Sequence, residues 1–439
     1  MTTAWNPSPT GKRLYTAWVV LLFTLVATFG FVDRIIVQVL VQPIKTELQV
    51  SDSHMGLLGG LAFAVLYVLL SIPIARLAER RNRLAIICVS TTLWSLATVV
   101  SGFASNFTHL LLARVGVGIG EAGNSPATLS ILSDTFPRER RASAFSIYSL
   151  AAPCGALVGG VLGGYVALHW GWRAAFQVVG LPGVLLALLL WFTLREPQRG
   201  QHDPGVDIAN TPPFSAVLRR FADRSSLIHI VLGTMLSTVG GYGISYFVAA
   251  YLTRHFGLDY AQAGWRLGLI SGVPAALSIM AGGFLSDWAG RRAAHWYALV
   301  PALGSILCAP FYIAAFRADT ANIATALLAV AALCQYAYIP ATAAITQNMM
   351  EPRMRATATA ITGLLYTLVG QGLGPWWVGA LSDHVGLRSA LTLWSLLYLW
   401  SGMHLVLGAR TLGRDFARTD SPMRPTAIQT PTAHFPGAR

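Results

Sequence analysis

The sequence predicts an all-α membrane protein with twelve transmembrane helices in two related six-helix halves. Composition is the first reason: hydrophobic residues make up 54% of the 439 residues and charged residues only 11%, against about 25% charged residues in soluble domains. A repeat is the second reason, because loop motifs of the first half return in the second half. This composition excludes a soluble globular protein and a disordered chain.

Twelve apolar stretches of the length that a transmembrane helix needs, about 20 residues, follow one another along the chain. They lie at 15–40, 53–75, 84–104, 107–133, 142–168 and 174–194, then at 226–252, 261–286, 294–316, 320–348, 356–382 and 389–410. The first stretch is too long for a cleaved signal peptide and is expected to be retained. We therefore expect an N-terminal bundle (1–194), a cytoplasmic linker (195–225), a C-terminal bundle (226–411) and a disordered cytoplasmic tail (412–439).

Lysine and arginine placement predicts the orientation, because cytoplasmic loops are enriched in these residues. With the N-terminus inside, 23 of the 31 basic residues fall on the cytoplasmic side and five on the outer side. The other three, Arg34, Arg114 and Arg266, lie within spans. Both termini are expected in the cytoplasm, and the expected location is a bacterial inner membrane. The net charge of +13 then indicates topology and affinity for anionic lipid, with no nucleic-acid partner.

Three motifs recur in the same order in equivalent loops. Residues 75–83 resemble 283–292, residues 137–144 resemble 352–358, and residues 171–175 resemble 386–390, at offsets of 208, 215 and 215 residues. Parallel repeats of this size are a recurring transporter architecture, with the substrate site between the halves near the bilayer midplane.

The loop Gly283-x-Leu285-Ser286-Asp287-x-x-Gly290-Arg291-Arg292 resembles the signature loop of the major facilitator superfamily. The first-half copy has Ala75, Glu79 and Asn82 where the signature has Gly, Asp and Gly. The fifth span, with Pro153-x-Gly155 and two later Gly-Gly pairs, is similar to the Gly/Pro-rich fifth span of that superfamily. The resemblance implies the major facilitator fold.

Within that superfamily, residues 30–200 resemble the spinster-like transporters. The motifs that carry this resemblance are Phe31-Val32-Asp33-Arg34, Met55-Gly56-Leu57-Leu58, Gly118-Ile119-Gly120-Glu121-Ala122, Ser133-Asp134-x-Phe136-Pro137 and Trp172-Arg173-x-x-Phe176. In span 11 this chain has Gln371 where the family usually has Asp. The resemblance implies transport of lysolipids or sphingosine phosphate.

Of the 18 carboxylates, only Asp33 and Glu121 lie well inside a span. Charged groups at such depth usually face a cavity and take part in function. Asp33 is seven residues from the outer end of span 1 and Arg114 seven residues from the outer end of span 4, so both lie about 10 Å deep. The two side chains can therefore meet if these spans are neighbours. Glu121 is two turns deeper on the face of Arg114.

These charges predict proton coupling by Asp33 and Glu121, and binding of an anionic group by Arg34 and Arg114. An anion that occupies the arginines would leave Asp33 free to bind a proton. Two alternatives remain: a structural salt bridge between spans 1 and 4, and an Arg34 side chain that extends to the outer surface.

The second half offers polar stripes without charges. Spans 7, 10 and 11 carry Thr238, Tyr242 and Tyr246; Gln335, Tyr338, Thr342 and Thr346; and Thr359, Thr362 and Tyr366. We expect Tyr242, Tyr246, Tyr338 and Tyr366 to contact the substrate, with helix packing as the alternative. A charged half facing a neutral half suits an amphiphile with an anionic head and an apolar tail.

Charged residues of the two signature loops are expected to gate the inner face, namely Glu79, Arg80, Asp287, Arg291 and Arg292. An acid there can cap a neighbouring helix N-terminus and hold that face shut. Asp383 is a weaker counterpart at the outer face. The alternative interpretation is that these charges only set the orientation of the protein in the membrane.

We therefore expect a monomeric, proton-coupled secondary transporter of an amphiphilic organic anion, working by alternating access. The alternative is a carrier or drug/proton antiporter for another small molecule, such as a sugar or hydrophobic drug. An enzyme is not expected, because GxSxG, HExxH and GxxxxGK[ST] motifs are missing from the sequence. No cofactor and no metal site are expected, because the cysteines and histidines lack ligand spacing.

Overall fold

The computed structural model describes residues 9–199, 214–351 and 354–420, and every regular element in these ranges is a helix. The first half contains α1 (Pro9–Val39), α2 (Val41–Leu48), α3 (Asp52–Gly59), α4 (Leu61–Arg80), α5 (Arg83–Ser101), α6 (Phe107–Glu121), α7 (Asn124–Thr135), α8 (Arg138–Ser149) and α9 (Ala151–Thr193). The second half contains α11 (Ser225–Phe256), α12 (Tyr260–Gly290), α13 (Trp296–Arg317), α14 (Ala321–Gln335), α15 (Tyr338–Asn348), α16 (Arg355–Leu365), the π-helix η1 (Tyr366–Leu373), α17 (Gly374–Val385), α18 (Leu387–Trp394) and α19 (Leu397–Asp420). These helices form the predicted twelve-span architecture.

Helix breaks and turns divide the predicted spans differently from the hydropathy pattern. Nine segments of the described chain are long and apolar enough to cross a membrane by themselves, and one of them, Ser143–Thr193, has 51 residues. This segment contains predicted spans 5 and 6. Between these spans α9 changes direction at Gly171, whose φ of 83° suits glycine. Predicted span 4 is divided into α6 and α7, and span 11 is divided by η1.

The linker and the tail contain more helix than expected. In the linker, α10 (Phe214–Ala222) buries Val217 against the second half. The last span is longer than predicted, because α19 continues to Asp420. Asp415, which the sequence assigned to the tail, is buried and accepts a hydrogen bond from the Ser226 hydroxyl at 2.6 Å. The expectation of disorder was therefore wrong for the first part of the tail, and residues 421–439 lie outside the described part.

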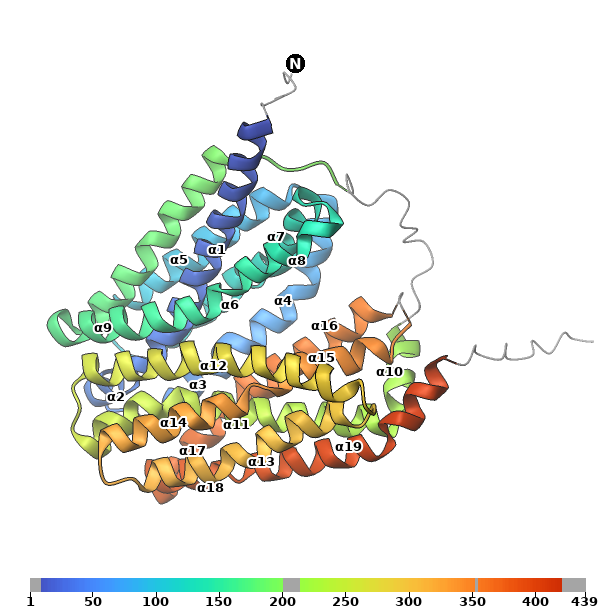
Figure 1. Ribbon diagram of the computed structural model, residues 1–439. Helices are drawn as coiled ribbons and strands as arrows, with labels where there is room; N and C mark the ends of the chain where they lie inside the picture. The colour runs from blue at the N-terminus through green and yellow to red at the C-terminus, as the bar shows by residue number, and fades with distance from the viewer. Residues whose placement is uncertain (1–8, 200–213, 352–353, 421–439) are drawn as a thin grey trace, which may run out of the picture.

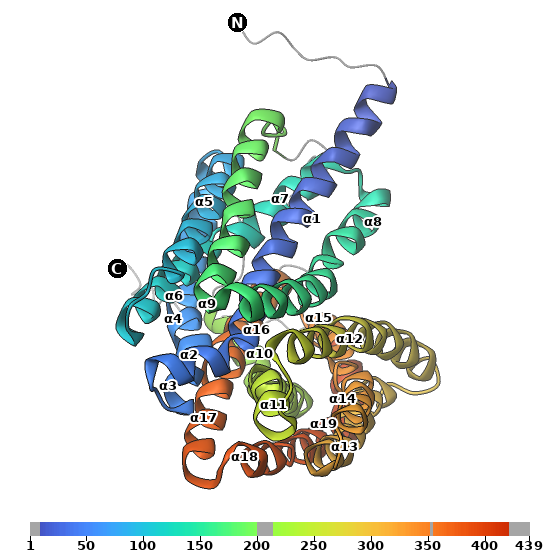
Figure 2. The same cartoon turned by 90° about the vertical axis from the view of Figure 1, so that its left-hand side faces the viewer.

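The two bundles pack against each other at one end (Figure 1). We call this the closed end; it contains α2, α3, α17 and α18 and faces the viewer in Figure 2. The opposite end, with α8, α10 and the last turns of α19, is called the open end. Close helix contacts use glycine: a Cβ at Gly160 would collide with the backbone of Gly264 and Gly268, and one at Gly56 with the backbone of Pro375. Substitution of these glycines would force the halves apart.

Large apolar side chains cover much of the exposed surface. Leu69, Phe192 and Phe284 are 61%, 78% and 72% exposed. Such a surface fits contact with lipid hydrocarbon, in which every backbone polar group must be satisfied within the protein. The helices provide this by their own hydrogen bonds.

Candidate functional site

Asp33 and Arg114 form the buried ion pair that their depths predict. The Arg114 Nη1 group donates to both carboxylate oxygens of Asp33, at 3.0 and 2.8 Å. Asp33 is fully buried and Arg114 is 2% exposed. Thr98 of α5, which the sequence analysis missed, donates its hydroxyl to Asp33 at 2.6 Å. The sequence signal that could have identified Thr98 was a hydroxyl within predicted span 3 on a face turned away from lipid.

Arg34 and Glu121 form a second pair that the spacing did not predict. The Arg34 Nε group donates to Glu121 Oε2 at 3.0 Å, and the Arg34 Nη2 group donates to the same oxygen. Successive residues on a helix differ by about 100° in direction, so Asp33 and Arg34 of α1 reach different neighbours. The side chain of Arg34 does not extend to the outer surface, the alternative considered from the sequence.

One oxygen of Glu121 has no partner. Glu121 is 7% exposed, and its Oε1 atom makes no hydrogen bond to any described residue. Glu121 lies at the end of α6, where the chain breaks before α7 restarts with Pro126 in its first turn. The same break recurs 214 residues further on, at Gln335 and Pro340. At these equivalent positions the first half has an acid, Glu121, and the second half has a neutral amide, Gln335.

Arg34 lies where three cavities meet. A cavity of about 250 Å³ extends between the halves, one of about 270 Å³ extends into the N-terminal half past Glu121, and a small one of about 30 Å³ reaches Arg114. The Arg34 side chain is 26% exposed. Its guanidinium carbon is 4.8 Å from the ring centre of Phe63 and 5.8 Å from that of Tyr67. Arg34 is therefore a cation with aromatic neighbours that a ligand can reach.

The polar stripes of the second half converge on a cavity of about 290 Å³. Among its lining residues are most members of the stripes, namely Thr238, Tyr242, Tyr338, Thr342, Thr346, Thr359, Thr362 and Tyr366. Tyr242 and Tyr338 also line the cavity that contains Arg34. Three of the four tyrosines expected at the substrate site thus face this space.

Several threonine hydroxyls in this cavity are already used by their own helices. Thr238, Thr342 and Thr346 donate to the carbonyl one turn earlier at 2.7–2.8 Å, and Thr359 and Thr362 do the same at 2.9 and 3.0 Å. These side chains therefore present methyl groups and oxygen lone pairs to a ligand. The wall suits apolar groups and hydrogen-bond donors better than a second anion.

Tyr246 and Gln335 have other surroundings. Tyr246 is 3% exposed and donates its hydroxyl to the Met55 carbonyl at 2.7 Å, across the two halves. Of the cavities lined by the described residues named above, it lines the small one next to Arg34 and Arg114. Gln335 accepts a hydrogen bond from the Tyr312 hydroxyl within the second half. Tyr246 thus helps to close the closed end.

Asp52 of α3 is the centre of the polar contacts at the closed end. Arg254 of α11 donates to both of its oxygens at 2.7 Å, Ser382 donates at 2.6 Å and Lys45 at 2.8 Å. Asp383 accepts from the backbone N–H groups of Asp52 and Ser53 at 2.8 and 3.0 Å, which caps α3. Burial acts to raise the pKa of Asp383, but these hydrogen bonds outweigh it and the pKa is lowered.

The acid capping expected at the inner face therefore occurs at the closed end. The five residues expected to gate are all exposed and lie at the C-terminal ends of α4 and α12, at the open end of the molecule. Asp287 accepts a hydrogen bond from Tyr297 at 3.2 Å within its own half, and Arg292 lies over the Trp288 ring. Near Glu79, the linker residue Glu196 caps α5 by accepting from the Leu84 N–H at 2.9 Å. In this conformation none of these contacts joins the two halves.

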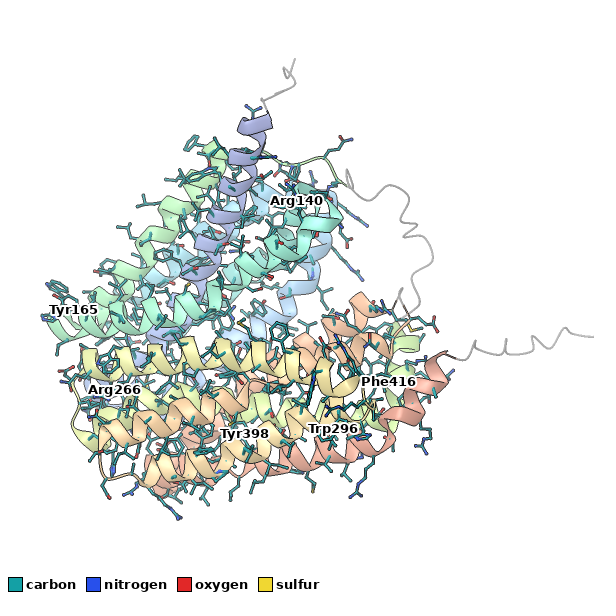
Figure 3. All side chains as sticks on the ribbon, viewed as in Figure 1. Arg140, Tyr165, Arg266, Trp296, Tyr398 and Phe416 are labelled. Carbon is teal, nitrogen blue, oxygen red and sulfur yellow. The ribbon has the colours of Figure 1, made fainter. Side chains whose placement is uncertain are left out.

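Arg266, the third arginine within a span, lies half-buried at the closed end (Figure 3). It donates to the Thr325 hydroxyl at 3.1 Å and its guanidinium carbon is 4.8 Å from the Trp265 ring centre. It lines none of the cavities that contain the residues of the two ion pairs.

Comparison with known proteins assigns the family. The chain matches the model of the Major Facilitator Superfamily over residues 22–375 and 230–432. It is 30% identical to an MFS-type efflux pump of Mycolicibacterium smegmatis, over 84% of this chain and 85% of that protein. It is 28% identical to the spinster homolog 1 protein of Xenopus tropicalis, over 84% and 74%.

A solved structure shares the fold over nearly the whole chain. It is the crystal structure of a bacterial homolog of the human lysosomal transporter Spinster, in an inward-facing and unoccupied conformation. The TM-score is 0.85 at 31% identity, with 93% of this chain and 99% of that chain covered. The chain belongs to the major facilitator superfamily of membrane transporters and resembles its spinster-like members.

Proposed function

We propose that this protein is a proton-coupled secondary transporter of an amphiphilic organic anion, of the lysolipid or sphingoid-phosphate type. The N-terminal bundle (1–194) and the C-terminal bundle (226–411) would rock against each other around the cavities between them. The observation that carries the proposal is the Arg34–Glu121 pair, since Arg34 faces three cavities and Glu121 has a buried, unpartnered oxygen.

The pair suggests how an anion and a proton are exchanged. A phosphate or carboxylate that takes hydrogen bonds from Arg34 would displace the Glu121 carboxylate. A buried carboxylate without a partner is costly as an anion, so Glu121 would then take up a proton. Asp33 and Arg114, which are more fully buried than Arg34, would hold α1 against α5 and α6 and share in proton binding.

The cavity of the second half supports the amphiphilic character of the substrate. Five of its threonine hydroxyls are donated to backbone carbonyls, so these side chains offer methyl groups and acceptor oxygens. An apolar chain, with or without a hydroxyl or ammonium donor, fits that wall. The anionic group would remain at Arg34, and Tyr242 and Tyr338 would contact both parts.

The orientation, gates and assembly belong to the same proposal. The distribution of the basic residues supports a cytoplasmic open end and cytoplasmic termini. The protein would lie in a bacterial inner membrane and act as a monomer. Glu79, Arg80, Asp287, Arg291 and Arg292 would meet across the halves only when the open end closes. The closed end would separate when Arg254 releases Asp52.

A ligand screen tests the substrate class. The purified protein would be heated with lysolipids, sphingoid phosphates, sugars and cationic drugs, and the unfolding temperature recorded. We expect lysolipids and sphingoid phosphates to stabilise it, and substitution Arg34→Gln to remove that effect. Stabilisation of both proteins by a neutral sugar or a cationic drug would support the second candidate, a sugar carrier or drug/proton antiporter, which the likeness to an efflux pump favours.

A further inference from the structure

A further cavity, of about 410 Å³, lies inside the N-terminal half at its open end. Its walls come from α1, α5, α7, α8 and the chain that follows α9. None of the residues that line it lines the cavities around Arg34 or the threonine-lined cavity. It is therefore separate from the proposed transport site.

The inner wall of this cavity is apolar. Val19 and Phe23 of α1 and Ile131 of α7 are 3%, 1% and 3% exposed, and all three line it. They belong to the buried apolar cluster of this bundle. Such a wall can accept a hydrocarbon segment but offers no polar partner.

The rim carries an excess of positive charge. Arg13 of α1, Arg140 of α8 and Arg195 after α9 line the cavity and are exposed. Figure 3 shows Arg140 at the open end of the N-terminal bundle. Of the described residues that line the cavity, one is acidic, Glu196, and it already accepts from Arg83 Nε at 2.6 Å and from the Leu84 N–H. Among the described residues, Arg13 and Arg140 have no acidic partner.

Tryptophan residues place the rim at the level of the lipid headgroups. Trp18, next to Val19 in the chain, donates its indole N–H to the Thr193 hydroxyl at 3.1 Å. Trp191 of α9 is 57% exposed and lies three residues before Leu194, which lines the cavity. Tryptophan is enriched at the membrane–water interface. A ligand in this cavity would therefore meet the headgroup layer and the start of the hydrocarbon core.

We propose that this cavity binds an anionic phospholipid of the surrounding membrane. The guanidinium groups of Arg13, Arg140 and Arg195 hold the phosphate, since arginine matches phosphate geometry with paired N–H donors. The first part of an acyl chain packs on Val19, Phe23 and Ile131. The bound lipid joins α1, α8 and the start of the linker, and so stabilises the open end of the N-terminal half.

Thermal unfolding of the purified full chain tests this site. Dioctanoyl phosphatidylglycerol, dioctanoyl phosphatidylcholine and inorganic phosphate would each be titrated in mild detergent. We expect phosphatidylglycerol alone to raise the unfolding temperature. The double variant Arg13→Gln/Arg140→Gln should need at least roughly tenfold more of it for the same shift.

Two further variants locate the effect. Arg410→Gln removes an exposed arginine at the open end of the other half, and Arg34→Gln alters the proposed transport site; both should keep the phosphatidylglycerol effect. Equal stabilisation by phosphatidylcholine, or by inorganic phosphate alone, would contradict the proposal. So would a double variant with unchanged response, or loss of the response in Arg34→Gln, since the lipid would then bind at the transport site.

Native mass spectrometry gives a second measurement that does not depend on unfolding. Phosphatidylglycerol should remain bound to the wild-type protein and to Arg410→Gln, and be lost from the double variant. Equal retention by all three proteins would overturn the assignment.

Discussion

At the scale of single residues, the site consists of two ion pairs with different exposure. Asp33 is fully buried and takes a hydrogen bond from Thr98, and its partner Arg114 is 2% exposed and borders the cavity of about 30 Å³, whereas Arg34–Glu121 borders the larger cavities. Only the second pair can exchange its partner for a ligand without a rearrangement of the bundle. The two arginines are therefore expected to behave differently when they are removed.

Substitution of Arg34 should weaken substrate binding, while substitution of Arg114 should weaken the fold. Arg34→Gln removes a charge-assisted hydrogen bond of about 1.5–3 kcal/mol, a loss of roughly tenfold to one-hundredfold in affinity. Arg114→Gln leaves Asp33 as an uncompensated buried charge, which destabilises by about 3–5 kcal/mol. Ligand affinity and unfolding temperature, measured on both proteins, separate the two roles. Wild-type affinity in a folded Arg34→Gln protein would rule out the anion site.

Glu121→Gln should abolish pH-dependent transport and leave substrate binding largely intact, because the amide mimics a permanently protonated acid. The measurement is uptake into vesicles with and without a pH gradient, together with binding at equilibrium. Asp319→Asn, a change of an exposed acid at the closed end, is the matched control and should keep the gradient dependence. A Glu121→Gln protein whose transport still responds to the pH gradient would show that another residue binds the coupled proton.

At the scale of helices, contacts at the closed end hold the observed conformation. Arg254 joins α11 to α3 through two hydrogen bonds to Asp52, and Asp383 of α17 caps α3. Together with the Tyr246–Met55 hydrogen bond and the glycine contacts, these bonds join the two halves at this end, so the halves can separate only when these bonds break. The observed conformation is therefore expected to depend strongly on Arg254.

Arg254→Ala should make the closed end more accessible. It removes two hydrogen bonds to a charged group, each about 1.5–3 kcal/mol, so the population open at this end should rise at least roughly tenfold. The readout is the labelling rate of a cysteine at Ser245, which lines the cavity between the halves, in a protein whose native cysteines are replaced by alanine. Arg317→Ala, an exposed arginine at the same end, is the control. Equal rates in both variants would show that the Asp52 contact does not hold the gate.

The same labelling should not depend on pH between 5 and 8. The pKa of Asp383 is lowered, so its contribution is fully present above its ordinary pKa and is lost only as pH falls below that value. Arg173 holds the pKa of Glu47 low in the same way. A pH response of transport in this range would then come from the carboxylates inside the bundles. A closed end that opens between pH 8 and pH 5 would contradict this assignment.

At the scale of the whole molecule, the distribution of basic residues predicts that the closed end faces outward. Cysteines placed at Lys45 and Arg317 should react with a membrane-impermeant reagent from outside intact cells, and one at Ala222 of α10 should not. The reverse pattern would overturn the orientation. Labelling after permeabilisation, where all three positions should react, is the control.

The amino-acid sequence by itself determined the membrane class, the two-half organisation and the depths of the charged residues, because these follow from composition, periodicity and helix rise. It predicted that Asp33 and Arg114 meet, since equal depth in neighbouring spans brings them together. It also found the hydroxyl stripes of spans 7, 10 and 11, because helical spacing places such residues on one face.

Only the tertiary structure decided which partners these residues have. Arg34 and Glu121 differ in depth, and their contact depends on the long Arg34 side chain, which donates to Glu121 at the last residue of α6. Asp52, Arg254 and Asp383 lie far apart in the chain, and their contacts depend on the arrangement of the two halves in the observed conformation. The residues expected to gate make no contact between the halves for the same reason. A sequence specifies helices through local periodicity, but one sequence supports several arrangements of two rigid halves, and contacts between them belong to each arrangement.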